Sequence, residues 1–202
     1  MSAGSAGNGR DRGAVSEGDH GFGARGRLWA LLVDPHGQLA ALAGAQPSAN
    51  GALGAEGPAC RPARIACAGP RAERHPEEYE LLVEAIYEGY LLHYGSPRIV
   101  RPPEDDLGLL AGDRLYAIGL ARLVALGDTS AVAELADTIT LSALAHGAGD
   151  PELAAAVWEA GARAVGWGPS PPHARAKRMV AVGDPRGLDA MRTSAAPLPA
   201  SR

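Results

Sequence analysis

The sequence has too few cysteines to define a metal site or a disulfide framework. Its 202 residues include only Cys60 and Cys67, with no second pair and no histidine at zinc-finger spacing around them. A disulfide between them would close only a small loop, so we expect two free thiols in a reducing cytoplasm. The sequence therefore predicts neither a zinc site nor a disulfide-stabilised scaffold.

Long apolar runs are also missing. The longest run near the start is only six residues, Leu28–Val33, and Asp34 and Pro35 end it at once. An export signal needs an apolar region of roughly 7 to 15 residues, and a membrane-spanning helix needs about 20. We therefore expect a cytoplasmic protein with no signal peptide and no transmembrane segment.

Basic charge is scarce in the middle of the chain. Residues 76–166 carry fifteen Asp and Glu against five Arg, whereas the flanking stretches are mildly basic. A nucleic-acid-binding surface needs clustered Lys and Arg to neutralise phosphates. An acidic body of this kind argues against a nucleic-acid partner.

Both ends of the chain lack a sustained apolar pattern. The 27 Gly and 16 Pro of the chain favour a single folded body with long tails. Segments with little apolar surface do not offset an ordering entropy of roughly 1–2 kcal/mol per residue. We therefore predict a disordered or irregular segment over residues 1–75, a helical domain over 76–166 and a disordered tail over 167–202.

The central domain has the 3.6-residue apolar period of amphipathic helices. In the first helix this period is carried by Tyr79, Leu82, Val83, Ile86, Tyr87 and Tyr90. Proline at first-turn positions, acids at helix starts and glycines after helix ends mark the limits. The expected helices run from Pro76 to before Gly95, from about Asp105 to Leu126, from Asp128 or Thr129 to about His146, and from Pro151 to before Gly166. This pattern predicts an all-α fold, a small bundle of about four helices.

The second expected helix contains three glycines, which indicate a close neighbour. Gly108, Gly112 and Gly119 each cost about 1 kcal/mol relative to alanine. Asp113, between Gly112 and Arg114, would need a partner if it were buried. We interpret these four positions, the three glycines and Asp113, as a helix-packing or partner surface. The alternative is that the glycines only reflect an Ala/Gly-rich composition.

The expected core is small. About ninety ordered residues rich in alanine form a marginal domain by themselves, because alanine buries little area. We therefore expect association with a protein partner or with further copies of the chain.

Carboxylates in the first helix are the candidates for chemistry. Glu84 and Glu88 lie four residues apart on one side of that helix, a spacing that could hold a divalent cation. The alternative is an ordinary solvated acidic face. His93 and His146 have no nucleophile or acid in a recognisable arrangement, and we assign no catalytic residues.

One segment resembles a known family. The matching runs are Leu110-Ala111-Gly112-Asp113-Arg114-Leu115, Ala121-Arg122-Leu123 and Leu126-Gly127-Asp128. They resemble a helix of trans-polyprenyl diphosphate synthases. Gly95-Ser96-Pro97 begins seventeen residues before Gly112, where that family has Gly-x-Pro, and the resemblance covers about residues 79–147.

The departures from that family concern its catalytic groups. At the position of its metal-binding DDxxD motif this chain reads Glu84-Ala85-Ile86-Tyr87-Glu88, and the family's Arg-Arg pair is replaced by His93-Tyr94. In the family these groups hold Mg²⁺ ions and the substrate diphosphate. The resemblance therefore implies a relative that has lost this chemistry.

These observations favour a non-catalytic function without a cofactor. The first hypothesis is an accessory subunit or interaction protein, associated with a polyprenyl diphosphate synthase. The second is a stand-alone helical scaffold or binding protein unrelated to isoprenoid metabolism. The third is a divergent metal-dependent prenyltransferase, which would use Mg²⁺ at Glu84 and Glu88.

Overall fold

The computed structural model describes residues 24–33 and 61–196, and these residues form an all-α fold. The elements within the described ranges are α1 (Ala24–Leu32), α2 (Arg61–Cys67), a 3₁₀ helix η4 (Pro70–Ala72), α3 (Pro76–Tyr94), α4 (Asp105–Ala125), α5 (Thr129–Gly147), α6 (Pro151–Trp167), α7 (Pro171–Ala181) and α8 (Gly187–Ala195). Within the described ranges, none of the helices combines the length and the apolar character that a membrane span requires.

The four helices expected in the central domain are present as α3, α4, α5 and α6. Side-chain caps and glycine residues next to these helices determine where they begin and end. The side chains of Asp128 and Asp150 accept the backbone N–H groups of Ala131 and Leu153 at 3.0 and 2.9 Å, which caps α5 and α6. Gly127 follows α4 with a φ of 76°, a left-handed conformation that glycine adopts without strain.

The expected count of about four helices was too low. Helices α1, α2, α7 and α8 lie inside the stretches for which irregular structure was predicted. In α7, Pro171 and Pro172 occupy the first turn and Ser170 caps it by accepting the N–H of His173, so these prolines start a helix. Such short helices gain their stability from packing, which composition does not reveal. The predictions for residues 1–23, 34–60 and 197–202, including Cys60, lie outside the described residues.

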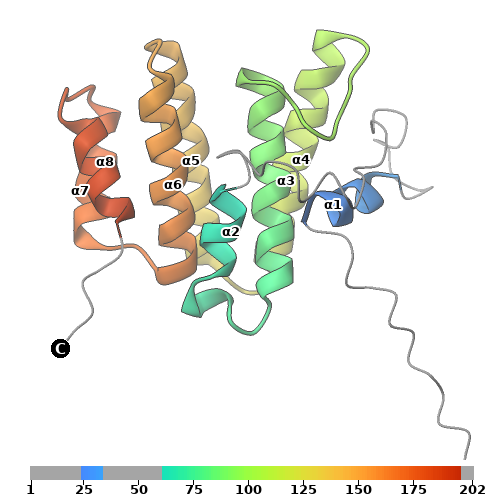
Figure 1. Cartoon of the computed structure of the whole chain (residues 1–202), viewed down its shortest axis with the longest axis horizontal. Coiled ribbons are helices and arrows are strands. Elements are labelled where there is room, and N and C mark those ends of the chain that lie inside the picture. The colour runs from blue at the N-terminus through green and yellow to red at the C-terminus, as the bar shows by residue number, and fades with distance from the viewer. Residues whose placement is uncertain (1–23, 34–60, 197–202) are drawn as a thin grey trace, which may run out of the picture.

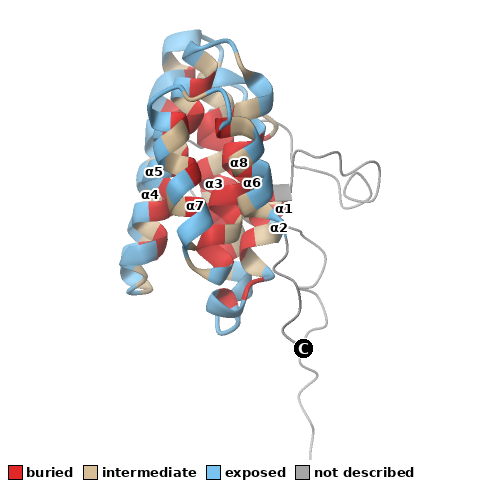
Figure 2. Cartoon of the chain, turned by 90° about the vertical axis from the view of Figure 1, so that its left-hand side faces the viewer, coloured by how far each residue is buried: buried red, intermediate tan, exposed pale blue. Residues whose placement is uncertain are grey.

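The helices form antiparallel pairs that stand side by side (Figure 1). The pair α3–α4 lies at one side with α1 against it, α5–α6 is central, and α7–α8 lies at the opposite side. Helix α2 sits between α3 and α6 and packs against both. Buried residues line the inner faces of these helices, while the outer faces are exposed (Figure 2).

Helix α3 is the most enclosed element of the α3–α4 side. Ten of its nineteen residues are buried, among them Leu82 and Ile86 in the core with α2. Farther along α3, the rings of Tyr87 and Tyr90 pack on Trp158 of α6, with ring centroids 4.9 and 5.1 Å away. The space between α3 and α6 is thus occupied by α2 at one level and by aromatic side chains at another.

Candidate functional site

The two glutamates expected on one face of the first helix lie side by side on α3. Both are buried, with 1% of Glu84 and none of Glu88 exposed to solvent. They face the connection between α3 and α4, where Arg98, Ile99 and Val100 lie. Their environment is a protein interior and not the solvated face that the alternative interpretation predicted.

Glu88 binds the backbone of this connection. Its Oε1 accepts the N–H groups of Arg98, Ile99 and Val100 at 2.7, 2.6 and 3.1 Å, and its Oε2 accepts the Nε–H of Arg98 at 3.2 Å. Buried backbone amides need such acceptors, and a carboxylate that accepts several of them is a strong one. Glu88 therefore fixes the course of the chain between the two helices.

Arg98 neutralises the pair of glutamates. One of its terminal nitrogens lies 2.9 Å from Oε1 of Glu84, and its guanidinium group lies 5.0 Å from the ring centroid of Tyr87. Only 12% of the Arg98 side chain is exposed. Sequence analysis did not assign a role to Arg98, although an arginine just after a helix that carries two inward acids was a usable signal.

Two carboxylates share one guanidinium, so the cluster would bury a net negative charge if both were ionised. Burial raises the pKa of Glu84 to about 7, an effect that Arg98 opposes and Glu88 reinforces. Protonation of Glu84 relieves this excess of negative charge. Among the described residues, no three His, Cys, Asp or Glu side chains gather closely enough to hold a metal ion.

Stability should depend on pH through Glu84. Because its pKa in the folded state is raised from 4.5 to about 7, its contribution is greatest below pH 4.5 and is lost as the pH rises through 7. The substitution Glu84→Gln removes the free-energy cost of keeping an ionised carboxylate buried. We therefore expect it to stabilise the protein by about 1–3 kcal/mol at pH 8 and by less at pH 5. Urea denaturation of both proteins at the two pH values measures the difference. Equal effects at both pH values would contradict the assignment.

Two of the glycines singled out in α4 lie where α4 meets α3. A Cβ added at Gly112 would come within 2.6 Å of the His93 ring and 3.0 Å of the backbone oxygen of Gly89. One added at Gly119 would come within 2.4 Å of the Ile86 side chain. Gly108 instead faces Pro102, in the connection that precedes α4. Gly112 and Gly119 thus allow α4 to approach α3 closely within one chain.

Asp113 projects outward from α4. Its side chain is 68% exposed, and one carboxylate oxygen lies 3.2 Å from Nε2 of His93. The His93 ring stacks on Tyr116, with an angle of 5° between the planes. Because Asp113 reaches water, it does not need the buried partner that an inward position would have required.

The outward face of α4, which we define as Leu110, Arg114, Ala117, Ala121 and Val124, exposes four apolar side chains and one arginine. Leu110 is 65% and Val124 59% exposed, and the two alanines between them are exposed as well. These positions recur every three or four residues and share one side of the helix. Leu110 and Val124 are thus the large apolar side chains that this face offers to a partner.

A second buried charge cluster joins α5 to α7. Glu134 is 6% exposed and lies 3.1 Å from Nε2 of His173 and 2.9 Å from Nζ of Lys177. Although burial raises the pKa of Glu134, the hydrogen bonds from His173 and Lys177 outweigh it, and the pKa lies below its usual value. Sequence analysis missed this cluster because α7 was not predicted. We interpret it as the anchor of α7 on the bundle.

Comparison with other proteins does not assign this site to a family. No protein-family model matches the chain, and no curated protein and no solved structure matches it either.

Proposed function

We propose that this protein is a non-catalytic helical interaction protein that associates through the outward face of α4. The observation that carries the proposal is the exposure of Leu110 and Val124 on a helix whose other side is packed on α3. Burying such side chains against a partner is favourable by about 25 cal/mol for each Å² of apolar surface.

A second copy of the chain is the occupant that fits this face. Leu110 and Val124 each lie seven residues from Ala117, so the two large apolar residues of this face are placed symmetrically about that alanine. Two copies of α4 packed antiparallel about Ala117 would place Leu110 of each against Val124 of the other, as a two-fold interface requires. The small alanine at the centre allows the helices to approach closely.

The non-catalytic part of the proposal rests on the glutamate cluster. Glu88 is occupied by the backbone of the α3–α4 connection and Glu84 by Arg98. A diphosphate-binding site needs carboxylates that are free to hold Mg²⁺ on an open surface. Both glutamates here are buried and serve the fold. The proposal therefore includes no resident metal and no cofactor.

Association with a polyprenyl diphosphate synthase is the second candidate. It is favoured by the sequence resemblance over residues 79–147 and by the direct contact of Gly89 with Gly112 between the two helices of that segment. In this case the outward face of α4 would contact a synthase chain instead of a second copy. A stand-alone scaffold would use neither partner.

The dimer can be tested with charge substitutions on α4. A single helix pair is a small interface, so we expect a dissociation constant of about 10–100 μM. The double variant Leu110→Glu, Val124→Glu should be monomeric at all concentrations in sedimentation equilibrium, because it places like charges at the contact. Leu144→Glu, at another exposed apolar position on α5, is the matched control and should still dimerise.

Three results would count against this proposal. A wild-type protein that stays monomeric at millimolar concentration has no dimer interface on α4. If, in addition, a co-expressed prenyl synthase from the same genome co-purifies with the wild type and not with the double variant, the second candidate replaces the first. Heat released by Mg²⁺ and pyrophosphate in calorimetry would contradict the non-catalytic assignment.

A further inference from the structure

Ser194 on α8 lies beside the buried charge cluster that joins α5 to α7. Its Oγ is 3.4 Å from Nδ1 of His173, and Nε2 of the same ring is 3.1 Å from Oε2 of Glu134. The fold brings these residues together from three helices, although 21 and 39 positions separate the contacting pairs. A hydroxyl, an imidazole and a carboxylate in this order are the groups that activate a serine nucleophile. Without a substrate, the contact between such a serine and its base is often longer than an ideal hydrogen bond.

The hydrogen bonds of His173 place its Nδ1 as a proton acceptor for the serine. Glu134 has a lowered pKa, so at neutral pH it is a carboxylate, which only accepts hydrogen bonds. The proton of a neutral His173 ring therefore lies on Nε2, and Nδ1 keeps its lone pair. The Ser194 hydroxyl has two acceptors, this nitrogen and the carbonyl of Met191 at 2.9 Å. Rotation about the Cβ–Oγ bond turns its hydrogen from the carbonyl to the imidazole.

The remaining charges of the cluster favour proton uptake by His173. Nζ of Lys177 lies 3.0 and 2.9 Å from the two carboxylate oxygens of Glu134 and 2.7 Å from Oδ2 of Asp137. Two carboxylates and one ammonium group leave one negative charge in excess. An imidazolium at His173 neutralises this excess, which stabilises the charge that forms when the ring takes the serine proton.

The surroundings of Ser194 fit a single acyl transfer. The residue is partly exposed, so an acyl donor can reach it. It lies in the last turn of α8, whose backbone N–H groups are bonded within the helix and do not form an oxyanion hole there. Without such donors, Ser194 attacks only an acyl carbon that has a good leaving group. For the same reason the acyl-serine that results is hydrolysed slowly and accumulates.

We propose that Ser194 is an acylation site, which takes one acyl group from an activated donor such as a thioester. Its Oγ forms a bond to the acyl carbon, and the bond from that carbon to the leaving sulfur breaks. His173 Nδ1 takes the hydroxyl proton and passes it to the leaving thiolate, while Glu134 positions the ring. The chain is modified once and does not turn over, so the site goes beyond the non-catalytic function proposed for α4. Helices α7 and α8 lie on the side opposite α4 (Figure 1), and the proposal stands whether or not the chain dimerises.

The test is reaction of the full chain with p-nitrophenyl acetate, an ester with a good leaving group. We expect a burst of one p-nitrophenolate per chain and, in peptides analysed by mass spectrometry, one acetyl group on Ser194. Ser194→Ala should abolish both the burst and this label. Ser130→Ala, which removes an exposed serine at the start of α5, is the matched control and should react as the wild type does.

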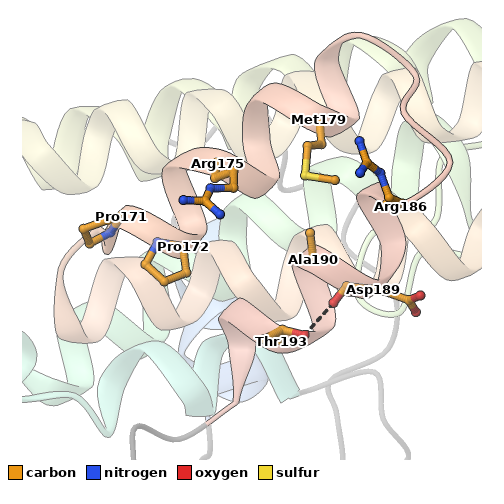
Figure 3. Close-up of a pocket in the computed structure, with 8 residues that line it drawn as sticks. All are labelled: Pro171, Pro172, Arg175, Met179, Arg186, Asp189, Ala190 and Thr193. Carbon is orange, nitrogen blue, oxygen red and sulfur yellow. Dashed lines mark hydrogen bonds between the residues drawn. The ribbon is translucent and has the colours of Figure 1, made fainter.

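Neighbouring nucleophiles show whether exposure alone explains the label. Thr193 is exposed, lines the open cleft between α7 and α8 and donates its hydroxyl to the Asp189 carbonyl at 2.8 Å (Figure 3). An acetyl group on Thr193, Ser130 or Lys177 but not on Ser194 would overturn the proposal. The absence of a burst from the wild-type protein would overturn it as well.

The role of His173 has a separate measurement. His173→Gln should slow the acylation of Ser194 by about 100-fold or more, because it removes the general base. The wild-type protein provides a second readout that needs no variant. Its acylation rate should rise with pH and then level off, since a neutral imidazole is a base that saturates. A rate that stays proportional to the hydroxide concentration would show that Ser194 reacts without His173 and would overturn the assignment.

Discussion

Glu88→Ala is expected to lower the free energy of unfolding by about 3–5 kcal/mol. The substitution removes the acceptor of three buried or part-buried backbone N–H groups and one of the two carboxylate partners of Arg98, which is 12% exposed. Each buried donor left without an acceptor costs about 1–3 kcal/mol, while Arg98 keeps its ion pair with Glu84. Chemical denaturation monitored by circular dichroism measures the loss.

Glu152→Ala provides the matched control for this prediction. Glu152 also pairs with an arginine, Arg192, but its side chain is 71% exposed. An exposed pair of this kind contributes little, so we expect a change within about 0.5 kcal/mol. If Glu88→Ala cost no more than Glu152→Ala, the connection between α3 and α4 would not depend on the carboxylate.

Gly119→Leu is expected to destabilise the protein by about 3 kcal/mol. A Cβ at this position already comes within 2.4 Å of the Ile86 side chain and 2.9 Å of the Leu82 backbone oxygen. The side chain of Ile86 can shift, but the backbone of α3 moves only if the two helices separate. The loss of packing between them outweighs the helix propensity that leucine gains over glycine, about 1 kcal/mol.

The same substitution at Gly147 serves as the reference. Gly147 is the last residue of α5, and no described atom lies within 4 Å of a Cβ built there. Gly147→Leu should therefore leave the stability within about 0.5 kcal/mol of the wild type. Equal midpoints for Gly119→Leu and Gly147→Leu in urea denaturation would show that α4 does not need close contact at Gly119.

The sequence predicts the central helices well because their signals are local. The apolar period, Pro151 at the start of α6 and Gly127 after α4 all act within a few residues. Helices α7 and α8 were not predicted because their apolar positions are few, such as Val180 and Met191, and gain their effect only against α5 and α6. Packing partners far apart in sequence decide whether such a segment is helical.

The candidate site was predicted only in part, for a similar reason. Helical spacing placed Glu84 and Glu88 on one face, and the structure shows them together on α3. Helical spacing does not predict which residues pack against that face. At Arg98 the chain returns to the two glutamates and forms an internal ion pair with them, where a cation site was possible. This return depends on the length and course of the non-helical connection between α3 and α4. The cluster of Glu134, His173 and Lys177 was missed because it requires α7, which the sequence did not predict.

The position of α2 between α3 and α6 has a consequence for cooperativity. Just after α2, Gly69 at the N-cap of η4 approaches Gly166 of α6 so closely that an added Cβ would overlap that backbone. The pairs α3–α4 and α5–α6 each have local contacts, but α2 joins them and belongs to neither. Native-state hydrogen exchange should therefore report one unfolding unit, in which amides of α3 and α6 open with the same free energy. Loosening α2 should lower this shared free energy, while the rings of Tyr87 and Tyr90 on Trp158 keep α3 and α6 in contact.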